Sequence, residues 1–374
     1  MRVAVAKEIK AGEKRVALVP DIISKLTKAG LEVVIESNAG LASEYSDKQF
    51  TDAGALVKNG DVLVNADVVL SVQPLTPAQI KTLKKGCITI SFLAATTAAD
   101  SIEAAVLAGV TAISLEMVPR ISRAQSMDAL TSQALCAGYK AALVAAELSP
   151  KFFPLLMTAA GTVTPAKVVV LGAGVAGLQA IATAKRLGAV VSAYDVRPAS
   201  ADEVKSMGAK FITLELEALE GAGGYAREMT EERANKQRDL LTPYIAAADV
   251  LITTAAVPGR TAPRLVTAQM VSQMAPGSVV VDLAAESGGN VEGSVAGEII
   301  TNSNGVKIWG GKDVPSQLPF HASMLFSRNV VNLLLLMSKT VDGKPNGVIE
   351  PDFSDEIIDS ATLTHNGAKR EKGK

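Results

Sequence analysis

Histidine, cysteine and aromatic residues are scarce in this chain of 374 residues. It has two His, two Cys and one Trp, and aromatic residues make up 4%. Cys87 and Cys136 cannot build a disulfide framework, so we expect reduced, buried thiols. A metal site with several histidines is excluded, and an acid/base histidine would almost have to be His321.

A surplus of one charge and long apolar runs are also missing. Lys and Arg number 37 against 38 Asp and Glu, which argues against general binding to nucleic acid or an anionic membrane. Apolar runs such as 333–337 fall far short of the ~20 residues of a spanning helix, and the charged N-terminus has no signal-peptide core. We therefore expect a soluble, cytoplasmic chain.

Apolar residues are plentiful, at 48%, and follow two alternating patterns. Short apolar stretches typical of strands occur first at 3–6, 33–35, 68–72, 88–92 and 111–115. Helical patterns lie between them at 21–29, 77–85 and 98–107. Similar stretches follow at 168–172, 190–195, 211–214, 250–254, 278–283 and 306–309. Strands that alternate with helices predict parallel sheets covered on both faces.

Two long helical patterns, 126–148 and 321–338, lie next to the second series of strands. We predict an α/β fold of two open parallel-sheet domains joined by these helices around a cleft. The first domain takes in 1–125 plus 320–374, and the second, of Rossmann type, takes in 126–319. Residues 351–374 lose the apolar period and are interpreted as a frayed basic tail.

A glycine loop marks the start of the second series. Gly172, Gly174 and Gly177 form a GxGxxG between an apolar strand and an Ala-rich helix. This is the context of a dinucleotide fingerprint: a tight turn, a close backbone approach to the pyrophosphate, and close packing of helix on strand. The helix N-terminus offers unpaired N–H groups to phosphates.

An acid follows where the fingerprint requires one. Asp195 ends the next strand and can accept hydrogen bonds from the ribose hydroxyls, which favours NAD over NADP. Arg197 leaves this less clear, because an arginine near that position can pair with a 2′-phosphate. A second cluster, around Gly224 and Tyr225, is either a mobile flap or an ordinary solvated loop.

Polar residues also gather where the strand at 111–115 gives way to the long helix. Arg120, Arg123, Gln125 and Asp128 lie at the carboxyl end of that strand, where open α/β sheets bind ligands. The plainer interpretation is helix capping by Ser122 or Ser126. Composition alone leaves both alternatives open.

Several long motifs resemble one family, the NAD(H)-binding component of proton-translocating NAD(P) transhydrogenase. They are KEIKAGEKRVALVP at 7–20, VPRISRAQSMDAL at 118–130, the segment 157–189 around the glycine loop, GGYAREM at 223–229, TTAAVPGRTAP at 253–263 and GSVVVDLAAESGGN at 277–290. The resemblance reaches to about residue 340. It implies a two-domain fold and a homodimer.

The resemblance also implies roles for individual residues. Arg120 and Asp128 would hold the nicotinamide carboxamide of NAD(H), and Gln125 would reach toward NADP(H) on a partner component. Thr131 stands where the family usually has Ser, and Tyr225 would lie on a loop that closes over the nucleotide. Within the matching motifs, the implied cofactor-binding residues also include Val175, Ala176, Gly224 and Ala255.

The implied reaction fits a chain poor in histidine. Hydride transfer between two nicotinamides needs positioning and exclusion of water but no proton at the reacting carbons. In this family proton movement belongs to a membrane component. The resemblance therefore implies a cytoplasmic protein that is peripheral to the inner membrane through its partner subunits.

Alanine dehydrogenases resemble the same chain and are the alternative. Arg15 stands where they bind the substrate carboxylate, but Gln73 and Ala94 stand where they use Lys and His, and Glu286 where they use Asp. Because amino-acid oxidation must move a proton, these changes argue against it. Arg15 would then be tied to a nearby carboxylate. A nucleotide-binding regulatory module without catalysis is a third interpretation.

Overall fold

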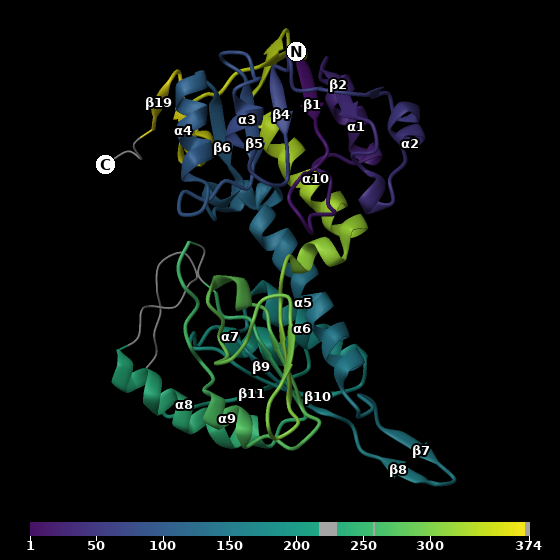
Figure 1. The fold of residues 1–374 in the computed structure, drawn as a ribbon, viewed down its shortest axis with the longest axis vertical. Coiled ribbons are helices and arrows are strands. Elements are labelled where there is room, and N and C mark those ends of the chain that lie inside the picture. The colour runs from purple at the N-terminus through teal and green to yellow at the C-terminus, as the bar shows by residue number, and fades with distance from the viewer. Residues whose placement is uncertain (217–229, 257–258, 371–374) are drawn as a thin grey trace. The chain divides into compact units, whose positions relative to one another are not determined.

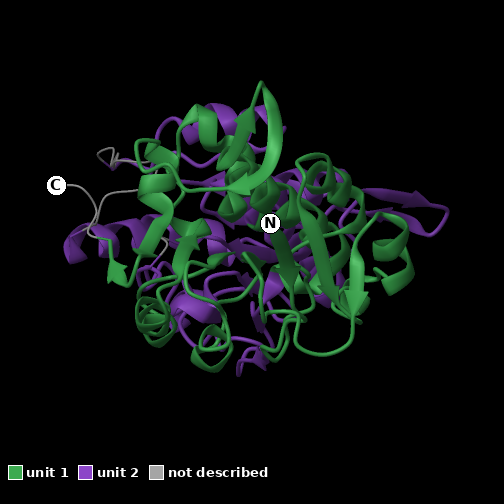
Figure 2. Cartoon of the chain, turned by 90° about the horizontal axis from the view of Figure 1, so that it is seen from above, with its two compact units in different colours: residues 1–133, 315–374 green, residues 134–314 purple. Residues whose placement is uncertain are grey.

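The computed structural model describes residues 1–216, 230–256 and 259–370. The chain divides into two compact units, here unit 1 (1–133 and 315–374) and unit 2 (134–314), coloured separately in Figure 2. The sequence placed the divisions at 125/126 and 319/320. Helix α5 (Ala129–Leu148) runs across the first division observed.

Unit 1 is built on an eight-stranded sheet in the order β19-β18-β6-β5-β4-β1-β2-β3. Its strands are β1 (Arg2–Val5), β2 (Glu32–Glu36), β3 (Leu56–Lys58), β4 (Val68–Leu70), β5 (Ile88–Ser91), β6 (Thr111–Ser114), β18 (Thr362–His365) and β19 (Ala368–Lys369). Strands β1 to β6 pair in parallel, as predicted, whereas β18 is antiparallel to both β6 and β19. The sheet is therefore mixed.

Both faces of this sheet are covered by apolar side chains (Figure 1). Val3 and Val5 pack in one buried cluster with residues of α1 (Pro20–Lys28) and α10 (Pro319–Leu336), while Ala4 packs in another with α4 (Ala99–Ala108). Alternate residues of one strand thus face opposite layers. The shorter helices are α2 (Asp47–Asp52), α3 (Pro77–Ile80) and α11 (Glu356–Ala361).

The predicted frayed tail is wrong for the part of it that the structure describes. Helix α11 buries Ile357 and Ile358, and β18 extends the sheet through the fully buried Thr364. The Thr364 hydroxyl donates to Val110 O and accepts from Ala112 N. These elements are only six and four residues long, which is too short for their apolar period to stand out.

Unit 2 holds a seven-stranded sheet in the order β11-β10-β9-β12-β13-β15-β14. Its strands are β9 (Lys167–Leu171), β10 (Val190–Tyr194), β11 (Lys210–Phe211), β12 (Val250–Thr253), β13 (Val279–Asp282), β14 (Ile299–Thr301) and β15 (Lys307–Gly310). All neighbours are parallel except β14, an antiparallel edge strand. The predicted α/β class is confirmed, with mixed rather than purely parallel sheets.

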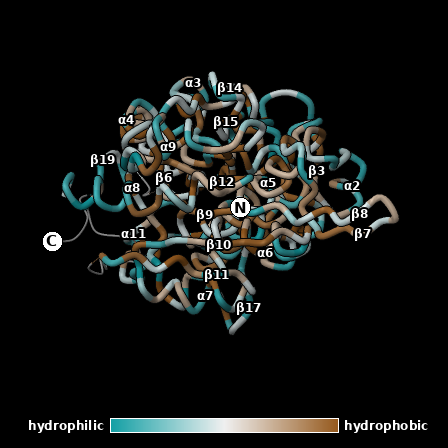
Figure 3. Tube along the Cα trace, turned by 90° about the horizontal axis from the view of Figure 1, so that it is seen from below, coloured by the Kyte–Doolittle hydropathy of each residue, from teal (hydrophilic) through white to brown (hydrophobic). Residues whose placement is uncertain are grey.

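The strand order of unit 2 reverses at β9, which lies between β10 and β12. A reversal point at the carboxyl end of parallel strands is where open α/β sheets bind ligands. Four helices accompany this sheet: α6 (Val175–Arg186), α7 (Ser200–Ser206), α8 (Glu231–Ala246) and α9 (Ala268–Ser272). Figure 3 shows the apolar character of the strands at its centre.

A separate hairpin of β7 (Leu156–Thr158) and β8 (Gly161–Val163) also belongs to unit 2. Within the described ranges of the chain, no helix combines the length and apolarity needed to cross a bilayer.

Candidate functional site

The glycine loop joins β9 to α6 in unit 2, and two of its glycines are required by close packing. Gly172 has φ +96°, and a Cβ there would lie 2.6 Å from the Thr254 hydroxyl. A Cβ on Gly177 would lie 1.8 Å from the carbonyl oxygen of Gly172. Any side chain at Gly177 would therefore push the helix off the turn.

Gly174 differs from these two glycines. A Cβ built on it meets no atom of the described residues within 4 Å, so packing does not explain its lack of a side chain. Gly174 and Val175 are exposed and Ala176 is half-buried at the start of α6, and no side chain caps that N-terminus. The backbone there can receive an anionic group such as a pyrophosphate, and the residues present fit that group.

Another glycine sets the position of the same helix. Gly138 of α5 faces the start of α6, where a Cβ would lie 2.0 Å from the Ala176 carbonyl oxygen. The sequence showed Gly138 only as an interruption of a helical pattern. Its close approach holds the N-terminal turn of α6 against α5.

Asp195 follows β10, and its carboxylate accepts four N–H groups. Oδ1 accepts from the backbone N (2.9 Å) and Nε (2.8 Å) of Arg197. Oδ2 accepts from Arg197 Nη2 (2.9 Å) and from Ala173 N (2.7 Å) in the glycine loop. Burial opposes ionisation, but the Arg197 and backbone hydrogen bonds outweigh it and lower the pKa of Asp195.

Ala255, at the end of β12, is held by a residue that the sequence did not single out. Asn290 donates from Nδ2 to Ala255 O (2.7 Å) and accepts from Ala255 N at Oδ1 (3.0 Å). Its own backbone N–H donates to the buried Asp282. Asn290 is fully buried, and no periodicity distinguished it in the motif SGGN. It fixes the loop that adjoins Gly172.

The segment from Arg120 to Thr131 lies in unit 1. Residues Ser122–Met127 form a 3₁₀ helix, η3, before α5 begins. The predicted cap at Ser122 or Ser126 is wrong, because Asp128 caps α5. Its carboxylate accepts from Thr131 N (2.8 Å) and from the Thr131 hydroxyl (2.6 Å). An aspartate so placed satisfies orphan donors of the first turn.

Contacts from the C-terminal portion of the chain hold η3 in place. Asn329 and Asn332 of α10 donate from Nδ2 to Ser126 O at 2.9 and 3.2 Å. Arg123 forms a two-pronged ion pair with Asp355, at 2.6 and 3.0 Å. Arg123 is therefore a tether. Gln125, between these anchors, is exposed.

Arg120 is also exposed. The structure thus brings Arg120, Gln125, Asp128 and Thr131 together in unit 1, and the glycine loop, Asp195, Arg197 and Ala255 together in unit 2. The predicted roles of Gly224 and Tyr225 lie outside the described residues.

Arg15 is buried in unit 1 and paired with Glu13, as the sequence predicted for a side chain tied to a carboxylate. Arg15 Nε and Nη2 donate to the two Glu13 oxygens at 2.8 and 2.6 Å, and Nη1 donates to Gln133. Glu13 also accepts from Gln73 Nε2 (2.6 Å) and the Ser316 hydroxyl (2.5 Å). These donors outweigh burial and lower the pKa of Glu13 to about 2.

This cluster has no acid/base group at Gln73, whose amide donates to Glu13. Glu286, in unit 2, accepts from the backbone N of Asp313 at 2.9 Å. Cys87 and Cys136 are free and buried, as predicted.

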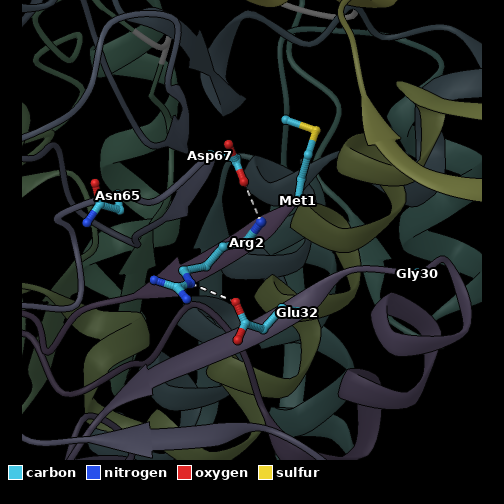
Figure 4. Close-up of a pocket in the computed structure, with 6 residues that line it drawn as sticks. All are labelled: Met1, Arg2, Gly30, Glu32, Asn65 and Asp67. Atoms are coloured by element: carbon cyan, nitrogen blue, oxygen red, sulfur yellow. Dashed lines mark hydrogen bonds and ion pairs between the residues drawn. The ribbon is translucent and has the colours of Figure 1, made fainter.

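A pocket of about 400 Å³ lies elsewhere in unit 1, around the N-terminal ends of β1 and β2 (Figure 4). Its charged groups pair with one another: Arg2 Nε donates to Glu32 at 2.7 Å, and Arg2 N donates to Asp67 at 2.6 Å. It lies at the end of the sheet opposite to the one where α/β proteins bind ligands. We therefore place the functional site at the glycine loop.

Comparison with known proteins agrees with this placement. The chain matches the families described as Alanine dehydrogenase/PNT, N-terminal domain, over residues 4–137 and Alanine dehydrogenase/PNT, C-terminal domain, over residues 141–372. The fold and glycine loop define a nucleotide-binding protein of the oxidoreductase class. The chain belongs to the Alanine dehydrogenase/PNT family.

Three relatives indicate its place within the family. A Rhodospirillum rubrum protein, named as the first segment of a divided NAD(P) transhydrogenase subunit alpha, is 45% identical over 378 residues, covering 98% of this chain and 97% of that protein. A crystal structure of transhydrogenase from Sinorhizobium meliloti is 42% identical, with a TM-score of 0.86 and coverage of 99% and 98%. The alanine dehydrogenase of Bacillus subtilis is 32% identical over 296 residues, covering 78% of this chain and 72% of that protein.

Proposed function

We propose that this chain is the NAD(H)-binding component of a proton-translocating NAD(P) transhydrogenase, with hydride passing directly between NADH and NADP⁺ held by a partner component. The observation that carries the proposal is the glycine loop at the strand-order reversal, with Gly174 open and Asp195 beside it. The similarity to transhydrogenase alpha subunits supports it.

In unit 2 the proposal gives each residue a physical task. The exposed N–H groups around Gly174, Val175 and Ala176 receive the pyrophosphate. Asp195 accepts the hydroxyls of the adenosine ribose, and its negative charge disfavours a 2′-phosphate. Bound NAD(H) supplies the hydride chemistry, and the chain supplies binding and orientation.

In unit 1 the proposal assigns the nicotinamide end to the segment held by α10. Arg120 and Asp128, supported by Thr131, bind the carboxamide, and the exposed Gln125 reaches toward the second nucleotide. The anchors on Ser126 and Arg123 keep η3 rigid. Rigidity matters here because a hydride transfer depends on holding two reactants at a short distance in one orientation.

Amino-acid oxidation is the alternative, and the surroundings of Arg15 argue against it. An amino-acid substrate needs a free cation for its carboxylate and a group that moves a proton. Arg15 is already neutralised by Glu13, and the neighbouring amide of Gln73 cannot exchange a proton at neutral pH.

The proposal includes partners and a place in the cell. The NADP(H)-binding component supplies the second nucleotide, and a membrane component carries the protons. The chain then works at the cytoplasmic face of the inner membrane through these subunits, as a homodimer. The naming of its relative as one segment of an alpha subunit supports a multi-component assembly.

The test is a hydride-transfer assay with NADH, the purified NADP(H)-binding component and an acetylpyridine nucleotide as acceptor. We expect turnover with the wild-type chain and none with L-alanine and NAD⁺. Gln125→Asn should slow transfer about 10-fold or more while leaving the Kd for NADH within about twofold, because only the approach of the two rings is altered.

Two control variants complete the assay. Gln269→Asn, at an exposed position on α9, should change neither rate nor affinity. Gly174→Ala should fold normally yet lose NADH affinity, because its methyl group meets only open space where the pyrophosphate is proposed to bind. Absence of hydride transfer by the wild-type chain, or unchanged NADH binding by Gly174→Ala, would refute the proposed function.

A further inference from the structure

The Asp195 carboxylate is saturated by donors of its own chain. An ionised carboxylate offers about four lone-pair sites on its two oxygens. Four N–H groups occupy them: three from Arg197 and one from Ala173, at 2.7 to 2.9 Å. A ribose diol cannot be added to this arrangement without removing a donor.

The donors differ in how easily they can leave. The N–H of Ala173 belongs to the glycine loop, where Ala173 is fully buried, and the N–H of Arg197 belongs to the turn after β10. Both are fixed by the backbone. The guanidinium of Arg197 contributes the other two contacts from a flexible side chain that is 24% exposed. Only the guanidinium can swing aside without changing the fold.

We propose that the Arg197 guanidinium is an internal competitor for the ribose-binding carboxylate, so that nucleotide binding requires its displacement from Asp195. Arg197 thereby sets both the affinity for NAD(H) and the rejection of 2′-phosphorylated nucleotides. This inference rests on the proposed function, because it assumes that Asp195 receives the adenosine ribose.

The same pair explains how an arginine can stand at this position without recruiting NADP(H). A free guanidinium beside a ribose site binds a 2′-phosphate through paired hydrogen bonds. Here two of its nitrogens are held by Asp195, and the carboxylate keeps its negative charge at the site. Glu203 of α7 adds further attraction for the guanidinium. Selectivity thus depends on the pair rather than on Asp195 alone.

A competitor lowers apparent affinity in proportion to the fraction of molecules in which it has moved aside. If the carboxylate is open in about 10–30% of molecules, removing the guanidinium should strengthen binding roughly three- to tenfold. This direction is opposite to that expected for a residue that touches the nucleotide, because loss of a cation otherwise weakens the binding of an anion.

The experiment measures NADH and NADPH binding by titration and by stopped-flow on the full-length chain. Arg197→Ala should lower the Kd for NADH roughly three- to tenfold through a faster association, with NADPH still excluded. Lys205→Ala, which removes an exposed cation from α7, is the control and should leave both affinities nearly unchanged. A thermal melt checks that each variant is folded.

A second variant tests selectivity. Asp195→Asn should weaken NADH and shift the preference toward NADPH by about tenfold, because the freed guanidinium can pair with a 2′-phosphate. Adding Arg197→Ala to this variant should abolish the gain. An unchanged or raised Kd for NADH in Arg197→Ala would overturn the inference. If the wild-type chain binds neither nucleotide, the proposed function itself fails.

Discussion

Two carboxylate–arginine pairs, one in each unit, share the same local geometry. In Glu13–Arg15 and in Asp195–Arg197 the arginine lies two residues after the acid. In both, its backbone N and Nε donate to one carboxylate oxygen and its Nη2 to the other. The backbone and the guanidinium thus close around the acid in an identical manner.

The surroundings of the two pairs differ. Glu13 and Arg15 are buried and bonded to Gln73, Gln133 and Ser316. In unit 2, Arg197 is 24% exposed, and Asp195 bonds to the glycine loop. A closed pair stabilises a fold, whereas a pair with an exposed arm can exchange a partner. The same two-residue spacing therefore serves structure in one unit and, we propose, ligand selection in the other.

The largest expected effect comes from opening the closed pair. Glu13→Ala leaves the buried Arg15 charge unpaired and should lower the free energy of unfolding of unit 1 by about 3–5 kcal/mol. Trp309, the single tryptophan, lies in unit 2, so its fluorescence separates the two units. In urea we expect the circular-dichroism transition to move to lower concentration while the Trp309 transition stays. An unmoved circular-dichroism transition would show that the pair contributes little.

Asp195→Ala tests the open pair in the same way. The fold should lose less than about 1 kcal/mol, because Arg197 can turn to solvent. The affinity for NADH should fall by about 1.5–3 kcal/mol, the value of a hydrogen bond to a charged group. Calorimetric titration measures the second quantity and urea unfolding the first. A stability loss as large as that of Glu13→Ala would erase the distinction between the pairs.

The pH dependence of stability distinguishes Glu13 from its neighbour Glu8. The pKa of Glu13 is lowered to about 2, so its contribution is complete above about pH 4.5 and is lost as the pH falls toward 2. The pKa of Glu8 is raised to about 7, mainly by burial. Its folded form binds the proton more tightly, so stability declines as the pH rises from about 4.5 to 7.

Glu8→Gln, which keeps an acceptor for the N–H groups of Val72 and Gln73, should therefore raise stability at pH 8 by about 1–2 kcal/mol and not at pH 4. Urea unfolding at the two pH values measures the difference. An equal effect at both would contradict the raised pKa of Glu8.

The smallest effect is expected at an exposed pair. Arg123 and Asp355 form two hydrogen bonds as good as those of the buried pair, but the Arg123 side chain is 51% exposed. Arg123→Ala should cost about 0.2–1 kcal/mol in urea unfolding, because solvent screens the pair. A loss comparable to that of Glu13→Ala would mean that burial is not what separates the pairs.

Much of the fold could be predicted from the sequence, because parallel strands buried on both faces are continuous apolar runs. The strands from β1 to β15 that form the two sheet centres gave such runs, and the glycine loop stood between one of them and a helix. The tail was mispredicted, since α11 and β18 are short and gain their stability from β6 and from buried Ile357 and Ile358.

The site could be predicted only incompletely. Glycines and the acid after β10 carry their signal in their spacing, and the capping role of Asp128 could be expected from its residue type. Asn290, Asn329 and Asn332 gave none, because each acts on the backbone of a segment distant in the chain. Asparagine fits many environments, and only the observed packing selects one.

The sequence by itself determined the α/β class, the glycine turn that only residues without a side chain can form, and the lack of histidine chemistry. These depend on local sterics and composition. Only the tertiary structure decided what each charged pair does. Glu13–Arg15 and Asp195–Arg197 look alike in sequence, and burial by distant residues closes the first while the second keeps a movable arm. Electrostatic strength depends on the surrounding medium, which distant segments of the chain supply.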